Sequence, residues 1–337
     1  MTPGEGGDGR RRKGGRDRDF PREEHPGDSY YGRPIINPPV WEEREIAGYL
    51  FTGGLAGASS ILAAGADLTG RPALARASRA MATGAIGVSL LALVKDLGRP
   101  ERFLNMLRVF KPTSPMSVGV WILVGYAPLA AGAAASDLPL VQTAFGRARR
   151  SGPAADRVRI AGRVAGLDAA ALGSAVATYT AALIANTAVP AWHECRRELP
   201  YLFAGSAASA AAGWALVAAP TTENEPAVRL AVLGALVELG AERIMERRLG
   251  MVAETLHQET AGRRLRIARS LTAAGALGAG LLARRGRSAA IAAGAALIAG
   301  SAFTRFGIFE AGMASARDPK YTVEPQRLRA RSRAAAG

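Results

Sequence analysis

Long apolar windows separated by short arginine-rich stretches constrain this chain more than any other feature of its sequence. A helix needs about 20 predominantly apolar residues to cross the hydrocarbon core of a bilayer. Windows of this kind lie at 46–66, 74–95, 116–136, 164–188, 200–219, 227–245, 267–283 and 287–309. Several are rich in Ala and Gly rather than Leu, and the sixth contains Glu238 and Glu242, so hydropathy alone supports six to eight spans. The pattern predicts an all-α integral membrane protein with about eight transmembrane helices.

The composition argues against several other classes of protein. The chain has 43 Lys and Arg against 28 Asp and Glu, a formal net charge of +15, yet 49% of its residues are hydrophobic. A disordered basic protein lacks such an apolar half, and a soluble enzyme needs more polar helix faces. The basic residues lie in short loops and at the ends, without interleaved aromatic residues. This favours anionic lipid headgroups over nucleic acid as their partner.

Cysteine and histidine usage limits the cofactors that we expect. The single Cys is Cys195, and the three His are His25, His193 and His257. One thiol supports neither a disulfide framework nor a cysteine-ligated cluster, and no pair of His falls on facing spans to hold a haem. We therefore expect no metal, haem or iron–sulfur cluster in this chain.

Composition divides the chain into three segments. Residues 1–29 are rich in Gly, Arg, Asp, Glu and Pro, and residues 321–337 are basic and poor in apolar side chains other than Ala. We expect both to be disordered tails on either side of a membrane domain at 30–320. No apolar stretch of signal-peptide type follows the charged N-terminus, so the first hydrophobic helix is expected to direct insertion.

A weak internal repeat suggests how the spans are grouped. Tyr49-Leu-Phe-Thr-Gly53 recurs as Tyr201-Leu-Phe-Ala-Gly205, and Arg-Glu closely precedes each copy. Repeats of this kind predict two four-helix bundles in one membrane domain. In a chain so rich in Ala and Gly, chance explains the match equally well.

Basic residues in the short loops predict the orientation. Eight spans place both termini on one side, which we call side A, together with the loops around 96–115, 189–199 and 246–266. Side A holds a small excess of Arg and Lys, which marks the cytoplasmic side of a membrane. We expect a multi-pass protein of the cell membrane with cytoplasmic termini.

Asp96, at the end of the second span, is a candidate functional residue. A charged group at that depth is costly unless it is paired or hydrated. One interpretation is a salt bridge to Arg99 or Arg102 at the water interface. The other is a protonatable carboxyl group beside a cavity. Glu45, just before the first span, is either solvated or opens an entry for protons.

Two further carboxyl groups lie inside the sixth span. Glu238 and Glu242 are one turn apart on one helix face. Carboxylates within a membrane commonly serve a function, which makes a proton route possible. Pairing with Arg243 or with another helix is the alternative.

Several motifs resemble one protein family when they are taken together and in order. They are Asp96-Leu-Gly-Arg-Pro-Glu-Arg-Phe103, Lys111-Pro-Thr-Ser-Pro115 leading into Gly119-Val-Trp121, Trp41-Glu-Glu-Arg-Glu-Ile-Ala-Gly-Tyr-Leu-Phe51, and Tyr179-Thr180 followed by Val189-Pro-Ala-Trp-His-Glu194. Across most of residues 30–320 the chain resembles the membrane subunit of the NrfD/polysulfide reductase family.

The resemblance implies an eight-helix subunit that oxidises or reduces a quinone, for which we expect menaquinone. In that family the electrons pass to or from a ferredoxin-like iron–sulfur subunit, usually together with a molybdopterin oxidoreductase subunit. Such a chain is a quinone-reactive part of an oxidoreductase complex, and it does not act alone.

The resemblance also implies roles for particular residues. Tyr179 matches the family's Tyr and would donate a hydrogen bond to a quinone carbonyl. Tyr49 stands where some relatives carry His, and Ile46 where they carry Asn. Asp96 would supply or accept the proton that quinone chemistry requires. We include Arg99 and Glu45 in the expected binding site.

Two alternatives remain open at this stage. One is a secondary transporter, which the repeat and the intramembrane acids suggest, although the broken helices of such proteins are not evident. The other is a catalytically inert membrane anchor of the same type of complex, which the missing His and Asn would fit.

Overall fold

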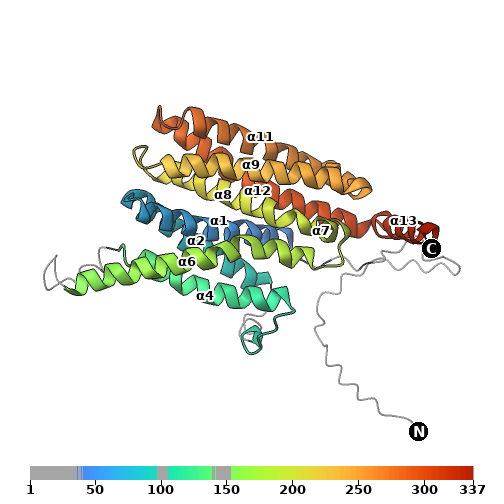
Figure 1. The fold of residues 1–337 in the computed structure, drawn as a ribbon, viewed down its shortest axis with the longest axis horizontal. Helices are drawn as coiled ribbons and strands as arrows, with labels where there is room; N and C mark the ends of the chain where they lie inside the picture. Colours follow the sequence, from blue (N-terminus) through green and yellow to red (C-terminus); the bar gives the residue numbers. More distant parts are fainter. Residues whose placement is uncertain are drawn as a thin grey trace, which may run out of the picture. The chain divides into compact units, whose positions relative to one another are not determined.

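The structure is a computed structural model that describes residues 36, 39, 41–96, 105–138, 141 and 153–336. The tail expected at 1–29 lies outside these residues, and so does Arg99. Within the described part of the chain every regular element is a helix (Figure 1).

Four long helices form an N-terminal group. They are α1 (Glu43–Leu68), α2 (Pro72–Asp96), α4 (Pro115–Ala135) and α6 (Pro153–Ala185). Three of them begin at proline, whose missing N–H group is not needed in the first helical turn. Gly70 makes the tight turn between α1 and α2 with a φ of 71°, a left-handed conformation that glycine adopts easily.

Four more long helices form a C-terminal group. They are α8 (Leu199–Ala218), α9 (Glu225–Arg248), α11 (Glu259–Leu281) and α12 (Arg287–Arg317). Short helical segments connect them or lead into them: α7 (Pro190–Glu194), η1 (Cys195–Arg197), η2 (Gly250–Ala253) and α10 (Glu254–His257).

Six of the long helices are apolar enough to cross a membrane by length and composition. They are α1, α2, α4, α6, α8 and α12. Helices α9 and α11 occupy the sixth and seventh predicted windows, but their Glu and Arg residues lower the hydropathy too far. The chain is therefore an all-helical, multi-pass membrane protein.

The long helices run lengthwise beside one another in the two groups (Figure 1). In the first group, α1 packs on α2 and α6, and α4 packs on α6. In the second, α8 packs on α9 and α12, and α11 packs on α12. Contacts of α1 with α8 and α12 join the groups. Gly57 of α1 touches the backbone at Gly173 of α6, where a methyl group would overlap the carbonyl oxygen. Such close approach replaces the hydrophobic effect where no water drives helices together.

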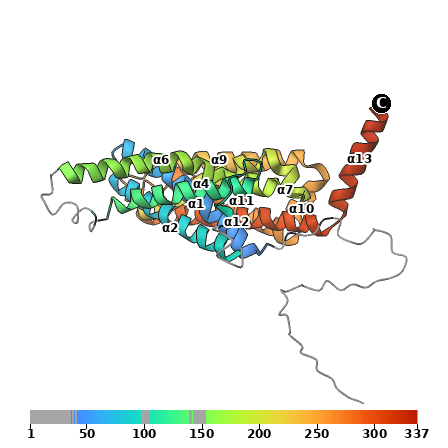
Figure 2. The ribbon, with the colours of Figure 1, turned by 90° about the horizontal axis from the view of Figure 1, so that it is seen from below.

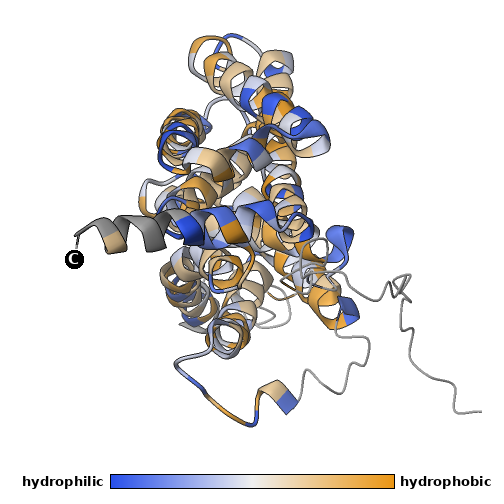
Figure 3. Cartoon of the chain, turned by 90° about the vertical axis from the view of Figure 1, so that its right-hand side faces the viewer, coloured by the Kyte–Doolittle hydropathy of each residue, from blue (hydrophilic) through white to orange (hydrophobic). Residues whose placement is uncertain are grey.

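Hydrophobic residues make up much of the helices in the view along the bundle, which colours the chain by hydropathy (Figure 3). Many large apolar side chains on these helices are exposed. Exposed examples are Val88 and Leu91 on α2, Leu233 and Leu236 on α9, and Leu277 and Leu281 on α11. Outward apolar side chains suit contact with lipid tails rather than water.

The C-terminal segment differs from our expectation. Residues 321–337 were predicted to be a disordered tail, whereas α13 (Lys320–Ala336) is helical and follows α12 in a different direction (Figure 2). Ala, Arg and Leu are strong helix formers, which explains the helix. Lys320 pairs with Glu254 at 2.9 Å, and Gln258 donates a hydrogen bond to Tyr321 at 2.7 Å. These bonds fasten the start of α13 to α10 and to Gln258, the residue between α10 and α11.

Candidate functional site

A small cavity of about 50 Å³ lies where α1 begins and α2 and α6 end. We call this the cavity end of the helix bundle. The lining residues are Trp41, Ile46, Tyr49, Leu93, Asp96, Met106, Met116, Val120, Tyr179 and Leu183. The cavity thus brings together three predicted site residues, Tyr49, Asp96 and Tyr179, which are distant in the sequence.

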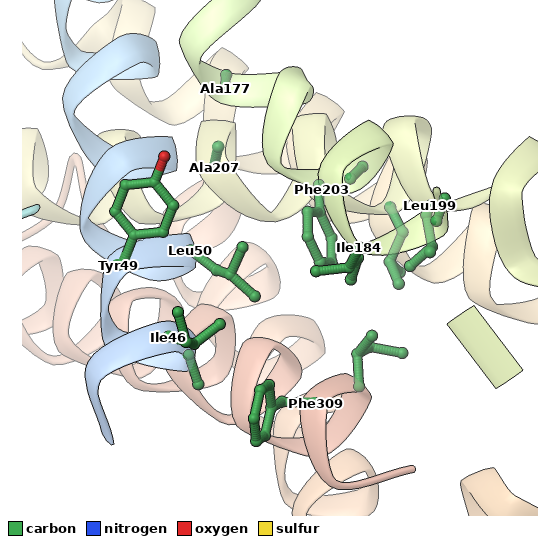
Figure 4. Packing of buried hydrophobic residues seen from close by; sticks show 14 of the residues in the cluster. Ile46, Tyr49, Leu50, Ala177, Ile184, Leu199, Phe203, Ala207 and Phe309 are labelled. Carbon is green, nitrogen blue, oxygen red and sulfur yellow. The ribbon is translucent and has the colours of Figure 1, made fainter. Parts of the chain in front are cut away.

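The two tyrosines meet inside the N-terminal group. Their ring centroids are 6.4 Å apart and the rings lie edge to face, an arrangement that aromatic pairs favour. Tyr49 is only 2% exposed and belongs to a cluster that includes Leu50, Phe203 and Phe309 (Figure 4).

Gly119 of α4 makes room for the second tyrosine, since a side chain there would overlap the ring of Tyr179. Within the described part of the chain, neither the Tyr49 nor the Tyr179 hydroxyl group has a protein hydrogen-bond partner. Each hydroxyl group therefore retains a donor for a ligand.

Asp96 is the last residue of α2 and is half-buried at the rim of the cavity. The carboxyl groups of Glu42 and Glu45 lie close enough to act on it electrostatically. Glu45 accepts a hydrogen bond from Lys95 at 2.8 Å, while its other oxygen, Oε2, is buried without a described partner. Glu45 is thus an ion-paired neighbour of Asp96 rather than a freely solvated residue.

Arg99 and Arg102 lie outside the described residues, so their pairing with Asp96 stays a prediction. The sequence motifs do not single out Lys95, which pairs with Glu45 and so joins α2 to α1. The position of Lys95 directly before Asp96 is the signal in the sequence that could have identified it.

An aromatic wall on the cavity was also missed. Trp41 lines the cavity and stacks on Trp192, with ring centroids 5.7 Å apart. Trp192 is 1% exposed, and its indole N–H donates to the carbonyl oxygen of Ile308 at 2.9 Å. An aromatic residue just before a first span is typical of the membrane interface, so the position of Trp41 in the sequence does not by itself indicate a place in this cavity.

The cavity has room for water but not for a quinone ring. Sites that bury small organic ligands have volumes of about 300 Å³ or more. Met106 and Met116 lie in its wall, and Met116 is 45% exposed. Methionine side chains are unbranched and flexible, so they provide a means for the cavity to widen.

The other two predicted carboxyl groups do not reach this cavity. Glu238 and Glu242 face the interior of the C-terminal group. Glu238 accepts a hydrogen bond from Thr304 at 2.7 Å, and Glu242 accepts one from Arg269 at 2.9 Å. The partner of Glu242 is therefore on the neighbouring helix α11, whereas Arg243 is exposed.

These features define a multi-pass membrane protein with an acid-lined and phenol-lined cavity at one end of its helices. Comparison with families of known proteins extends this description. The family described as polysulphide reductase, NrfD, matches residues 36–315. The chain belongs to the NrfD polysulphide reductase family. Members are membrane subunits of quinone-interacting oxidoreductase complexes that typically contain an iron–sulfur subunit and a catalytic subunit. A comparison with curated proteins found no match.

Proposed function

We propose that this chain binds a quinone or quinol, specifically menaquinone, at Tyr49, Asp96 and Tyr179, in the cavity once its wall at Met106 and Met116 has moved outward to admit the ring. The convergence of these three residues from α1, α2 and α6 is the observation that carries the proposal. Among the described residues the two phenol groups have no hydrogen-bond partner, the carboxyl group can exchange a proton, and the remaining wall is apolar. This donor set fits a quinone, which has two carbonyl acceptors on an apolar ring.

Each protein group has a role that follows from its position. The hydroxyl groups of Tyr179 and Tyr49 donate hydrogen bonds to a carbonyl oxygen and orient the ring. Asp96, at the rim, transfers protons between that oxygen and water, and Glu45 beside it connects the rim to the solvent. A proton-transfer group placed in this way commonly accelerates a reaction by about 100-fold or more.

A quinone supplies two-electron redox chemistry, and each reduction to the quinol takes up two protons. The electrons come from or go to an iron–sulfur subunit, which docks at the cavity end beside a molybdopterin oxidoreductase subunit. Residues at helix ends line the cavity, among them Asp96 at the end of α2 and Met116 near the start of α4, which supports this docking position. The basic loops favour a cytoplasmic location for that end.

The test is quinone-dependent electron transfer in the purified complex. We expect Asp96→Asn and Tyr179→Phe each to lower turnover by about 100-fold, because each removes a proton-transfer or orienting group. Tyr201→Phe is the matched control, since Tyr201 occupies the equivalent place in the repeat but is 65% exposed. Its turnover should equal that of the unaltered protein.

Other outcomes separate the alternatives. An inert anchor would keep full turnover in both variants, which would contradict the proposal. A transporter would show no quinone-dependent activity in any form, and would instead move a solute across vesicles.

A further inference from the structure

Three glutamates form a ladder along the inner face of α9. Glu238, Glu242 and Glu246 are spaced four residues apart, which places successive Cα atoms about 6 Å apart along the helix axis. The series passes from Glu238, which is 2% exposed, towards Glu246, whose side chain is 15% exposed. Four-residue spacing keeps all three on one face.

The outer end of the ladder lies at the cavity end of the bundle. Arg264 near the start of α11 pairs with Glu43 at the start of α1, so both helices begin at the same end. Arg269 of α11 bridges two members of the ladder, Glu242 and Glu246. His257 lies 3.8 Å from Glu246 and its side chain is 55% exposed. Ionisable groups thus continue from the surface into the bundle.

The inner end holds a second buried ionic group. Arg305 of α12 is 0% exposed and acts electrostatically on Glu238. Its Nη2 donates to the carbonyl oxygen of Phe203 at 2.7 Å, and its guanidinium lies 3.7 Å from the centre of the Phe203 ring. Arg305 Nε, Arg305 Nη1 and Glu238 Oε2 are buried without described partners.

Unpaired polar atoms at this depth are costly. Ionisable residues within a membrane domain therefore commonly mark proton or ion pathways. A purely structural ion pair would satisfy more of its donors and acceptors. The unsatisfied hydrogen-bonding atoms of Glu238 and Arg305 are suited to bind water molecules, which can pass protons to Glu238.

An apolar layer closes the path beyond Glu238. Towards the opposite end of the bundle, the interior of the C-terminal group is a buried cluster that includes Ala212, Leu216, Ala231, Ala293 and Leu297. Gly213 and Gly294 bring α8 and α12 into backbone contact within this layer. The layer insulates Glu238 from the opposite membrane face.

We propose that Glu246, Glu242 and Glu238 form a proton-uptake path from the cavity end to a proton-binding site at Glu238 and Arg305. A proton from water binds the carboxylate of Glu246 and passes to Glu242 and then to Glu238, aided by bridging water. The net change is one carboxylate converted to a carboxylic acid, with no electron transferred. The guanidinium of Arg305 also lies beside Gly54 of α1, the helix that carries Tyr49.

The test uses the full chain in lipid vesicles and needs no quinone, so it is independent of the proposed redox function. Infrared spectra recorded in H₂O and D₂O across a pH series detect the carbonyl stretch of a protonated carboxyl group. We expect a band that titrates with pH and that Glu238→Gln removes. Glu242→Gln should keep the band but slow its deuterium exchange by about 100-fold.

Glu225→Gln is the matched control, because Glu225 lies at the far end of the same helix and its side chain is 38% exposed. It should change neither the band nor its exchange rate. If Glu238→Gln fails to fold, Glu238→Asp should shift the band instead of removing it. The proposal is overturned if no titrating band depends on residue 238, or if Glu242→Gln leaves the exchange rate unchanged.

Discussion

Tyr49 and Tyr179 come from the first and fourth long helices, yet their ring centroids lie 6.4 Å apart, and both residues line a cavity with Asp96. At the residue scale, the sequence motifs point to all three of these side chains. They did not reveal Lys95 or Trp41, because neither residue type at such a place is unusual in a membrane protein. Which oxygen of Glu45 is paired, and with what, depends on the angle at which α1 meets α2.

Cys195 allows a residue-scale prediction. Burial raises the pKa of its thiol to about 12, so at neutral pH almost no reactive thiolate is present in the folded protein. We expect iodoacetamide to leave native protein unlabelled and to label it after denaturation. The raised pKa also means that the folded state holds this proton more tightly, so stability should fall as the pH rises above the ordinary thiol value.

Mass spectrometry of labelled native and denatured samples checks the first expectation. Cys195→Ser should abolish labelling in both samples. Rapid labelling of the native protein would show that the η1 segment opens to solvent.

At the element scale, α9 combines inward carboxyl groups with outward Leu233 and Leu236. This is the reverse of a helix on the surface of a soluble protein, where charged residues face water. Mean hydropathy cannot distinguish the two arrangements, because it does not depend on which face of the helix each side chain occupies. The inverted faces therefore support α9 as a membrane-spanning helix despite its low hydropathy.

Helix packing yields a prediction from one matched pair of glycines on α1. A methyl group at Gly57 overlaps the backbone of α6, whereas nothing lies within 4 Å of one at Gly65. We expect Gly57→Ala to lower the free energy of unfolding by about 1–3 kcal/mol through overpacking. Gly65→Ala should raise it by roughly 0.5–1 kcal/mol, because alanine loses less backbone entropy.

Denaturant titration of each variant in detergent micelles measures both effects. Equal changes in the two variants would mean that α1 and α6 do not pack as described.

At the scale of the whole molecule, two membrane topologies are distinguishable. A topology with eight spans and one with six place the connection after α9 on opposite sides of the membrane. With eight, Arg108 and Arg247 are on the same side of the membrane and Arg284 is on the other. With α9 and α11 outside the bilayer, Arg247 would instead share a side with Arg284. All three residues are exposed.

Cysteine introduced singly at these positions in a Cys195→Ser background decides between them. We expect a membrane-impermeant thiol reagent, applied to intact cells and to inverted vesicles, to label residues 108 and 247 from one side of the membrane and residue 284 from the other. Labelling of residues 247 and 284 from the same side would refute the eight-span topology. It would also place the proposed proton path outside the membrane.

The sequence by itself determined the all-helical class, the family and most helix positions, because apolar windows and prolines act over one helix at a time. Only the tertiary structure decided that Asp96 shares a cavity with two phenols while Glu238 and Glu242 face Thr304 and Arg269. Those contacts join residues far apart in the chain. They depend on how small residues let particular helices approach, and a single helix pattern does not contain that information.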